Sequence, residues 1–230
     1  MRFLCLHGGS TNSEVHIPYE LHTIQTYKQQ IFEIQTGGLR QQLEKNGHRF
    51  KFMNGKHDAQ VEEELEGVVD GPFYNHYPRG DNPPASTIQE AYDHTMQFIT
   101  EQGPFDAVMG FSQGAALAAS LIINHSKKNP TSAPLFRAAV FICGAAPWDS
   151  AGMEHILPRP DTYPIKIPTA NIVGKLDSLY GEGVRLFELC EPANAAFFDH
   201  GSKHMVPFDL RNTEEMVRVV EETVKKAMRG

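Results

Sequence analysis

A serine with a glycine two residues before it and another two residues after it is the feature of this sequence that most directly indicates chemistry. Gly110, Ser112 and Gly114 form this Gly-x-Ser-x-Gly pattern. The pattern is typical of a sharp strand-to-helix turn that presents a nucleophilic serine. Residues on either side of such a serine pass close together, and glycine removes the Cβ atoms that would collide. We therefore expect acyl transfer through a covalent acyl-enzyme.

A serine hydroxyl is a weak nucleophile at neutral pH and needs a neighbouring base, which an acid holds in the correct tautomer. In hydrolases with this turn the chain order is serine, acid, histidine. Asp177 and His204 follow Ser112 in that order, and each comes after a predicted strand. Asp149 is an alternative acid and His200 an alternative base. We favour Asp177, and we favour His204 because the loop before it is long enough to reach the serine.

The acid and the base also have simpler structural explanations. Asp177 precedes a predicted helix, so it can be an ordinary turn or N-cap residue. His204 is one of 11 histidines, and a single histidine is more often a surface or core residue. The agreement of both residues with Ser112, in chain order and in position, favours a catalytic triad.

The tetrahedral intermediate of acyl transfer needs two hydrogen-bond donors for its oxyanion. The backbone N–H groups of Gly9 and Gln113 are the candidates, because one follows the first strand and the other begins the helix after the serine. A plain tight turn is the alternative explanation for Gly8 and Gly9. The turn lacks the lysine and the glycine spacing of a phosphate-binding loop.

Large apolar side chains occur in several loops at the same predicted edge of the fold, where they could line an acyl pocket. Ordinary packing beneath long loops is the alternative for each of them. Cys143, by contrast, is predicted to be a small buried residue rather than a reactive thiol. The pocket candidates are Phe73, Tyr74, Tyr77, Trp148 and Met205.

Six apolar segments alternate with segments of helical periodicity. This alternation predicts a mostly parallel six-stranded sheet with helices on both faces. Ligands of such sheets bind at the carboxyl ends of the strands, which is where the catalytic candidates fall. The predicted strands are residues 2–7, 48–53, 105–111, 136–143, 168–173 and 193–198.

Three helices have further signals in the sequence. The apolar run from Ala115 to Ile123 predicts a helix that is buried nearly all round. Ser86 with Gln89 matches a capping box before an apolar helical face. Asn212 is the predicted start of the last helix.

Composition limits the class of protein. The 230 residues are 40% hydrophobic and 21% charged, which fits one globular domain over residues 1–230. The formal net charge of −7 and the lack of a basic run predict no nucleic-acid or membrane partner. Three cysteines without metal-like spacing predict reduced thiols, no metal or other cofactor, and a cytoplasmic protein.

Six short segments of the chain together resemble a fungal family of small α/β-hydrolase serine hydrolases. That family includes thioesterases acting beside polyketide synthases. The resemblance covers nearly the whole chain. It implies an α/β-hydrolase fold without the first two strands of larger members, and a triad of Ser112, Asp177 and His204. It also implies release of an acyl chain from a carrier thioester. The matching segments are residues 6–8, 70–74, 110–115, 143–144, 174–177 and 201–207.

Two departures from the family pattern lie near the predicted site. Residues 16–30 are an insertion, and their place at the mouth of the site predicts a lid. Gly9 stands where many relatives carry a bulkier residue. Residues 54–85 are in addition a long loop excursion near the active site, and a segment of that length inside a compact domain is usually functional or disordered.

The leading hypothesis is a serine hydrolase that releases a polyketide or other apolar acyl chain from a carrier, by hydrolysis or lactonisation. A general carboxylesterase of small esters is the second hypothesis. The third is a non-catalytic binding protein on a hydrolase scaffold, which would be expected to carry a broken triad.

Overall fold

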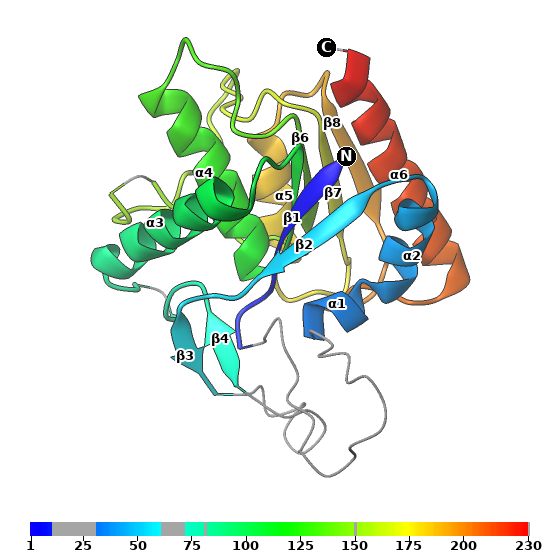
Figure 1. Ribbon diagram of the computed structural model, residues 1–230, viewed down its shortest axis with the longest axis horizontal. Coiled ribbons are helices and arrows are strands. Elements are labelled where there is room, and N and C mark those ends of the chain that lie inside the picture. Colours follow the sequence, from blue (N-terminus) through cyan, green and yellow to red (C-terminus); the bar gives the residue numbers. More distant parts are fainter. Residues whose placement is uncertain (11–30, 61–71, 81, 150, 230) are drawn as a thin grey trace.

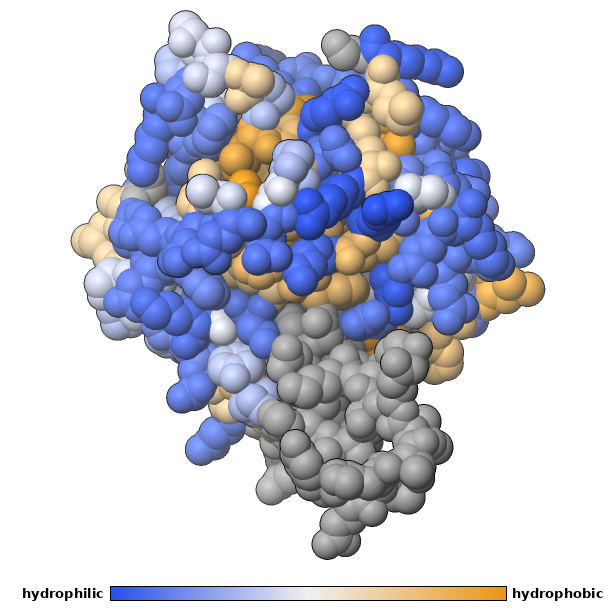
Figure 2. All heavy atoms as spheres, viewed as in Figure 1, coloured by the Kyte–Doolittle hydropathy of each residue, from blue (hydrophilic) through white to orange (hydrophobic). Residues whose placement is uncertain are grey.

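The computed structural model describes residues 1–10, 31–60, 72–80, 82–149 and 151–229. The predicted lid, residues 16–30, lies outside the described residues. Helices flank a central sheet on two sides, with α3 and α4 on one and α1, α2 and α6 on the other (Figure 1). Hydrophilic side chains cover most of the face seen in Figure 2.

All six predicted strands are present and form one sheet, in which every neighbouring pair is parallel. Its strand order is β2-β1-β5-β6-β7-β8, so the chain starts near one side of the sheet and winds outward in both directions. The strands are Arg2–Leu6 (β1), Arg49–Met53 (β2), Ala107–Phe111 (β5), Ala138–Ile142 (β6), Thr169–Val173 (β7) and Ala195–Asp199 (β8).

The register brings the carboxyl ends of the inner strands level with one another. Leu6 pairs with Gly110, Phe111 pairs with Ile142, and Val173 pairs with Asp199. The residues that follow these strands therefore emerge side by side along one edge of the sheet. This edge is where the site candidates are expected to meet.

Two apolar layers hold the helices against the sheet. Alternate strand side chains such as Leu4 and Phe141 pack under α3, α4 and α5, while Phe3 and Val140 pack under α1, α2 and α6. Residues Gln113–Asn124 are all buried, which confirms the prediction of a helix buried nearly all round. The helices are Ile31–Gln35 (α1), Gly37–Lys45 (α2), Ala85–Gln102 (α3), Gln113–Lys128 (α4), Tyr180–Glu188 (α5) and Leu210–Arg229 (α6).

Two predicted helix starts are wrong. Ser86 lies inside α3, which begins after Pro84, and the Thr87 hydroxyl donates to the Pro84 carbonyl at 2.6 Å. Asn212 lies inside α6, and the Asp209 carboxylate instead accepts its backbone N–H at 3.0 Å. In both cases a residue upstream of the predicted cap directly precedes the helix, because proline and aspartate also suit helix starts.

Part of the predicted excursion, residues 54–85, has regular structure. His57–Ala59 (β3) and Phe73–Asn75 (β4) form an antiparallel two-stranded sheet, with Asp58 opposite Tyr74. This small sheet lies beyond the carboxyl ends of β1 and β2 (Figure 1). Within the described residues, no helix is both long enough and apolar enough to cross a membrane.

Candidate active site

Ser112 occupies the turn between β5 and α4 in a conformation that few side chains adopt. Its backbone angles are φ 52° and ψ −118°. Such a conformation costs about 1–3 kcal/mol and persists only where the surroundings hold it. Here the Ser112 N–H donates to the Ile142 carbonyl at 2.9 Å, and the Ser112 carbonyl accepts the Ala116 N–H at 3.1 Å. The turn is thus strained and fixed on both sides.

The flanking glycines are required by close backbone contacts. A Cβ atom at Gly110 would lie 2.5 Å from the Gly114 carbonyl oxygen, and a Cβ atom at Gly114 would lie 2.2 Å from the Leu6 carbonyl oxygen. Both distances are shorter than Cβ atoms tolerate. The expected close approach across the serine turn is confirmed, and Gly114 additionally lets α4 approach β1.

Asp177 and His204 form a hydrogen-bonded pair in the loops after β7 and β8. The His204 Nδ1 atom lies 2.8 Å from Asp177 Oδ2, and the Asp177 side chain is 1% exposed. Because a carboxylate only accepts hydrogen bonds, Nδ1 carries the ring proton and Nε2 of the neutral ring has a free lone pair. The His204 side chain is 33% exposed, so this nitrogen belongs to a ring that solvent and substrate can reach.

Asp177 has both of the roles considered for it, as a turn residue before a helix and as the partner of the histidine. Its second oxygen, Oδ1, accepts the Leu179 N–H at 2.8 Å in the turn before α5, while Oδ2 binds the imidazole. A further bond from the Leu176 N–H to the Ser202 carbonyl, 3.1 Å long, joins the two loops. The turn role therefore orients the carboxylate toward His204.

The His204 ring lies beside the serine turn. Its centroid is 4.9 Å from that of Phe111, the residue before Ser112. Among the described residues, no hydrogen bond joins the Ser112 hydroxyl to the His204 ring. In free enzymes such a bond is often long and forms fully only with substrate bound. The structure thus brings all three candidates to one place at the edge of the sheet.

The alternative acid and base have other roles in the structure. Asp149 Oδ1 accepts the Met153 N–H at 2.9 Å within its own loop. His200 is buried, with Nδ1 accepting the Ser202 N–H at 3.2 Å and Nε2 lying 3.5 Å from the Cys143 sulfur. Burial lowers the pKa of His200. These contacts favour Asp177 and His204 over both alternatives.

The candidate oxyanion donors belong to two segments beside the serine: a Cβ atom at Gly8, in the first segment, would lie 3.5 Å from Ser112 Cβ. Gly9 is in the turn after β1, and Gln113 is the first residue of α4. Within the part of the chain that the structure describes, neither backbone N–H has a hydrogen-bond acceptor. The N-terminus of a 16-residue helix adds a partial positive charge at Gln113.

The buried side chains of Gln113 and Asn75, which we call the clamp, connect these two donor segments. The Gln113 amide accepts the His76 N–H at 2.8 Å and donates to the Tyr77 carbonyl at 2.8 Å. The Asn75 Oδ1 atom accepts the Ser10 N–H at 2.7 Å. The segment after β4 therefore holds the turn after β1 and the start of α4 together. The sequence did not reveal the clamp, because its partners are between 36 and 65 residues apart.

Two stacked histidines support the clamp from within. The rings of His7 and His76 are 4.5 Å apart, and His76 Nε2 donates to the His7 carbonyl at 3.1 Å. His7 Nε2 accepts the Gly55 N–H at 2.9 Å, so its proton is on Nδ1, facing the Gly8 carbonyl. Burial lowers the pKa of His7 to about 4, and burial beside His7 lowers the pKa of His76 as well. Both rings are neutral near pH 7.

The pocket candidates lie in different surroundings. Phe73 and Tyr74 are half-buried in β4, and Met205 is half-buried beside His204. Tyr77 belongs to the core. Trp148 is 5% exposed, and its ring lies 3.8 Å from the His155 ring in the core behind α4. These contacts explain Trp148 as a packing residue and give its assignment to the pocket no support.

One group of side chains has the atoms of a metal site. The Cys143 sulfur, an Asp177 oxygen and a His204 nitrogen all lie within 4.8 Å of one another. The Asp177–His204 hydrogen bond already uses two of these atoms. Burial and the nearby Asp177 carboxylate raise the pKa of the Cys143 thiol, which opposes the thiolate that a metal needs. The prediction of a buried, unreactive Cys143 agrees with this environment.

A parallel sheet with a strained serine turn after its third strand in chain order defines an α/β-hydrolase. A carboxylesterase from Mesorhizobium loti shares this fold, with a TM-score of 0.58 at 16% identity over 96% of this chain and 88% of that one. The chain belongs to the serine hydrolase (FSH1) family, whose model matches residues 21–216.

Individual relatives agree with this assignment. Esterase FPY3 of Fusarium mangiferae is 34% identical over 240 aligned positions, covering 100% of both chains. Hydrolase phiM of Talaromyces stipitatus is 27% identical, over 94% of this chain and 85% of that protein. The protein is therefore a serine hydrolase or esterase, and the predicted serine hydrolase family is confirmed.

Proposed function

We propose that this serine hydrolase cleaves a thioester or ester of an apolar acyl chain through Ser112, His204 and Asp177. The 2.8 Å bond between His204 Nδ1 and Asp177 Oδ2, beside a serine with φ 52°, is the observation that carries the proposal. This bond fixes the imidazole in the tautomer whose Nε2 can accept a proton.

In the proposed reaction, the Ser112 oxygen attacks the acyl carbon while His204 Nε2 takes its proton. The N–H groups of Gly9 and Gln113 bind the oxyanion that forms. As the intermediate collapses, His204 returns the proton to the leaving thiolate or alkoxide, and the acyl group stays on Ser112. Water, activated by the same nitrogen, then releases the acid. An internal hydroxyl of the acyl chain in place of water would give a lactone.

The substrate that we favour is a polyketide or similar acyl chain held as a carrier thioester. Two observations support it. One is the resemblance of the chain to thioesterases that act beside polyketide synthases. The other is that Phe73 and Tyr74, just before the clamp residue Asn75, and Met205, next to His204, are half-buried apolar side chains. A general carboxylesterase would share the triad but would not need a carrier.

Substitution of the serine tests the mechanism. We expect Ser112→Ala to lose labelling by a fluorophosphonate probe and to lower ester hydrolysis on the order of 10⁵-fold or more. Ser86→Ala, which changes an exposed serine of α3, is the matched control and should keep both properties. Labelling that persists in Ser112→Ala would exclude Ser112 as the nucleophile, and a labelled protein without turnover of any ester would support the binding-protein hypothesis.

Matched substrates test the choice of leaving group and chain length. Thioesters and oxygen esters of the same acyl group, from C4 to C14, separate the alternatives by kcat/KM. A preference for long thioesters supports acyl release from a carrier. A preference for short oxygen esters would instead identify a general carboxylesterase.

A further inference from the structure

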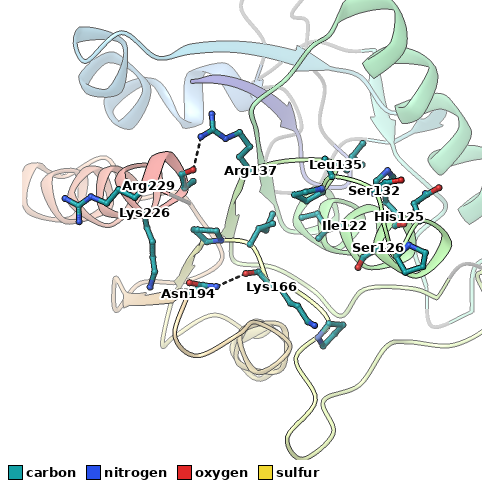
Figure 3. A pocket seen from close by; sticks show the side chains of 18 residues that line it. Ile122, His125, Ser126, Ser132, Leu135, Arg137, Lys166, Asn194, Lys226 and Arg229 are labelled. Carbon is teal, nitrogen blue, oxygen red and sulfur yellow. Dashed lines mark hydrogen bonds between the residues drawn. The ribbon is translucent and has the colours of Figure 1, made fainter.

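A second hollow lies at the opposite edge of the sheet from Ser112. It borders the starts of β6, β7 and β8 and the ends of α4 and α6, and its volume is about 760 Å³ (Figure 3). Ser112, Asp177 and His204 all follow the carboxyl ends of strands. A five-residue strand spans about 16 Å, so this hollow is separate from the serine turn.

The hollow has an apolar floor and a basic rim. Ile122, Leu135 and Ile167 line it, and we call these three side chains its floor because Ile122 and Ile167 are buried and Leu135 is half-buried. The rim carries four cations, Arg137, Lys166, Lys226 and Arg229, and none of the lining residues is acidic. The hollow is therefore basic, although the formal net charge of the chain is −7.

The rim cations come from three segments: Arg137 directly precedes β6, Lys166 precedes β7, and Lys226 and Arg229 lie at the end of α6 (Figure 3). Arg137 donates to the Ala227 carbonyl at 2.9 Å, and Lys226 donates to the Ala193 carbonyl. Both bonds are to neutral groups. Within the described part of the chain, none of the four cations forms an ion pair with a carboxylate. Their charge is therefore available to an anion.

We propose that this hollow binds an amphipathic monoanion, a medium- or long-chain carboxylate. Its hydrocarbon tail would lie on the floor, and its carboxylate would lie between Lys166 and Lys226. Apolar burial and charge complementarity act together in such a site, as they do in ligand pockets generally. Acids of this class are also what an acyl hydrolase releases, but the site does not depend on the role of Ser112.

Dodecanoate is the probe for this proposal. Binding is measured by calorimetry to the full chain, with the serine blocked by fluorophosphonate and the extent of blocking read by mass spectrometry. We expect one saturable site. Shortening the acid to decanoate removes two CH₂ groups and should weaken binding about 15-fold, since each buried CH₂ contributes about fourfold. Dodecanol and dodecylamine should bind at least tenfold more weakly than dodecanoate.

Charge reversal locates the site. The double variant Lys166→Glu with Lys226→Glu should weaken dodecanoate binding at least tenfold. The control is Lys51→Glu with Lys225→Glu, an equal charge change at exposed lysines outside the hollow, one of them also on α6. The control should bind like the wild type, and unfolding curves compare the folding of both variants.

Three results would overturn the proposal. They are no saturable binding, equal loss in the two double variants, and equal binding of dodecylamine. Loss of binding upon blocking of the serine would place the acid in the active site instead. Because blocking is measured by mass, a failure of fluorophosphonate labelling counts against the proposed nucleophile and not against this hollow.

Discussion

At the scale of single residues, the site depends on which atoms carry protons. Asp177 uses one carboxylate oxygen for the Leu179 N–H and the other for His204 Nδ1. The first contact fixes the carboxylate and the second fixes the imidazole tautomer. Asparagine, an uncharged amide of the same shape, can still accept the Leu179 N–H. Its NH₂ group would donate to His204 Nδ1, where the carboxylate accepts.

Asp177→Asn is accordingly expected to lower kcat about 10⁴-fold, the effect that the wrong histidine tautomer has in other serine hydrolases. The amide oxygen still accepts the Leu179 N–H, but the amide NH₂ faces His204 Nδ1 and forces the ring proton onto Nε2. Steady-state hydrolysis of a chromogenic ester measures the loss.

Asp149→Asn is the matched control, because Asp149 is the alternative acid and its Oδ1 likewise accepts a backbone N–H. We expect this variant to keep kcat within a few fold. A larger loss in Asp149→Asn than in Asp177→Asn would show that the acid has been assigned to the wrong residue.

At the scale of elements, the serine turn depends on close backbone packing. A Cβ atom at Gly114 would lie 2.2 Å from the Leu6 carbonyl oxygen, which cannot move without shifting β1. We expect Gly114→Ala to lower the free energy of unfolding by about 1–3 kcal/mol, the usual cost of overpacking, and to abolish most activity. Urea unfolding followed by circular dichroism measures the first effect.

Gly181 provides the opposite case within α5. A Cβ atom there would meet nothing within 4 Å. Gly181→Ala should therefore raise the free energy of unfolding by about 0.5–1 kcal/mol, because alanine loses less conformational entropy in a helix. If Gly114→Ala and Gly181→Ala changed the free energy of unfolding alike, close contact would not explain why position 114 needs glycine.

The clamp makes a different prediction, about catalysis. Gln113→Ala removes the side chain that joins α4 to residues 76 and 77 but keeps the Gln113 backbone N–H, a candidate oxyanion donor. We expect kcat to fall about 10- to 100-fold, less than the 10²–10³-fold loss of a whole oxyanion donor, with little change in KM. A trifluoromethyl ketone inhibitor, which forms an oxyanion when the serine adds to it, should lose affinity by about the same factor as kcat.

Gln97→Ala, at an exposed amide of α3, is the control for the clamp and should change neither quantity. Restoring part of the clamp with Gln113→Glu, which retains the acceptor for the His76 N–H but not the donor to Tyr77, should give an intermediate kcat. A fall in kcat without a matching loss of inhibitor affinity would mean that the clamp does not act through the oxyanion donors.

The sequence predicted the elements whose signals are local. Six apolar strands, the glycines around Ser112 and the buried helix after it each depend on near neighbours, and the structure confirms them. The clamp and the pairing of β3 with β4 depend on contacts between distant segments, and no periodicity in the sequence encodes them. The starts of α3 and α6 were misplaced because residues just upstream, Pro84 and Asp209, also suit a helix start.

At the scale of the whole molecule, the sheet separates two kinds of surface. The carboxyl ends of its strands carry the serine turn and the loops of Asp177 and His204, and the opposite edge carries the basic hollow. Close to the serine turn, two uncharged imidazoles are buried in the fold, and their state links the stability of the whole molecule to pH.

Stability is expected to fall in mild acid because of His7 and His76. Their pKa values are lowered in the folded protein, that of His7 to about 4, whereas an unfolded histidine titrates near 6.5. Between those values the unfolded chain binds more protons, so acid favours unfolding. The contribution is fully present above about pH 6.5 and declines toward pH 4, by at most about 1.4 kcal/mol per pH unit for each ring.

Urea unfolding at pH 7.5, 6.5, 5.5 and 4.5 measures this slope, and His76→Gln apportions it between the two rings. The glutamine amide can still donate to the His7 carbonyl, but it does not titrate, so the slope below pH 6.5 should fall by about half. His125→Gln, at a half-buried position at the end of α4, should leave the slope unchanged. An unchanged slope in His76→Gln would mean that His76 contributes nothing to the acid sensitivity, which would contradict the part assigned to that ring.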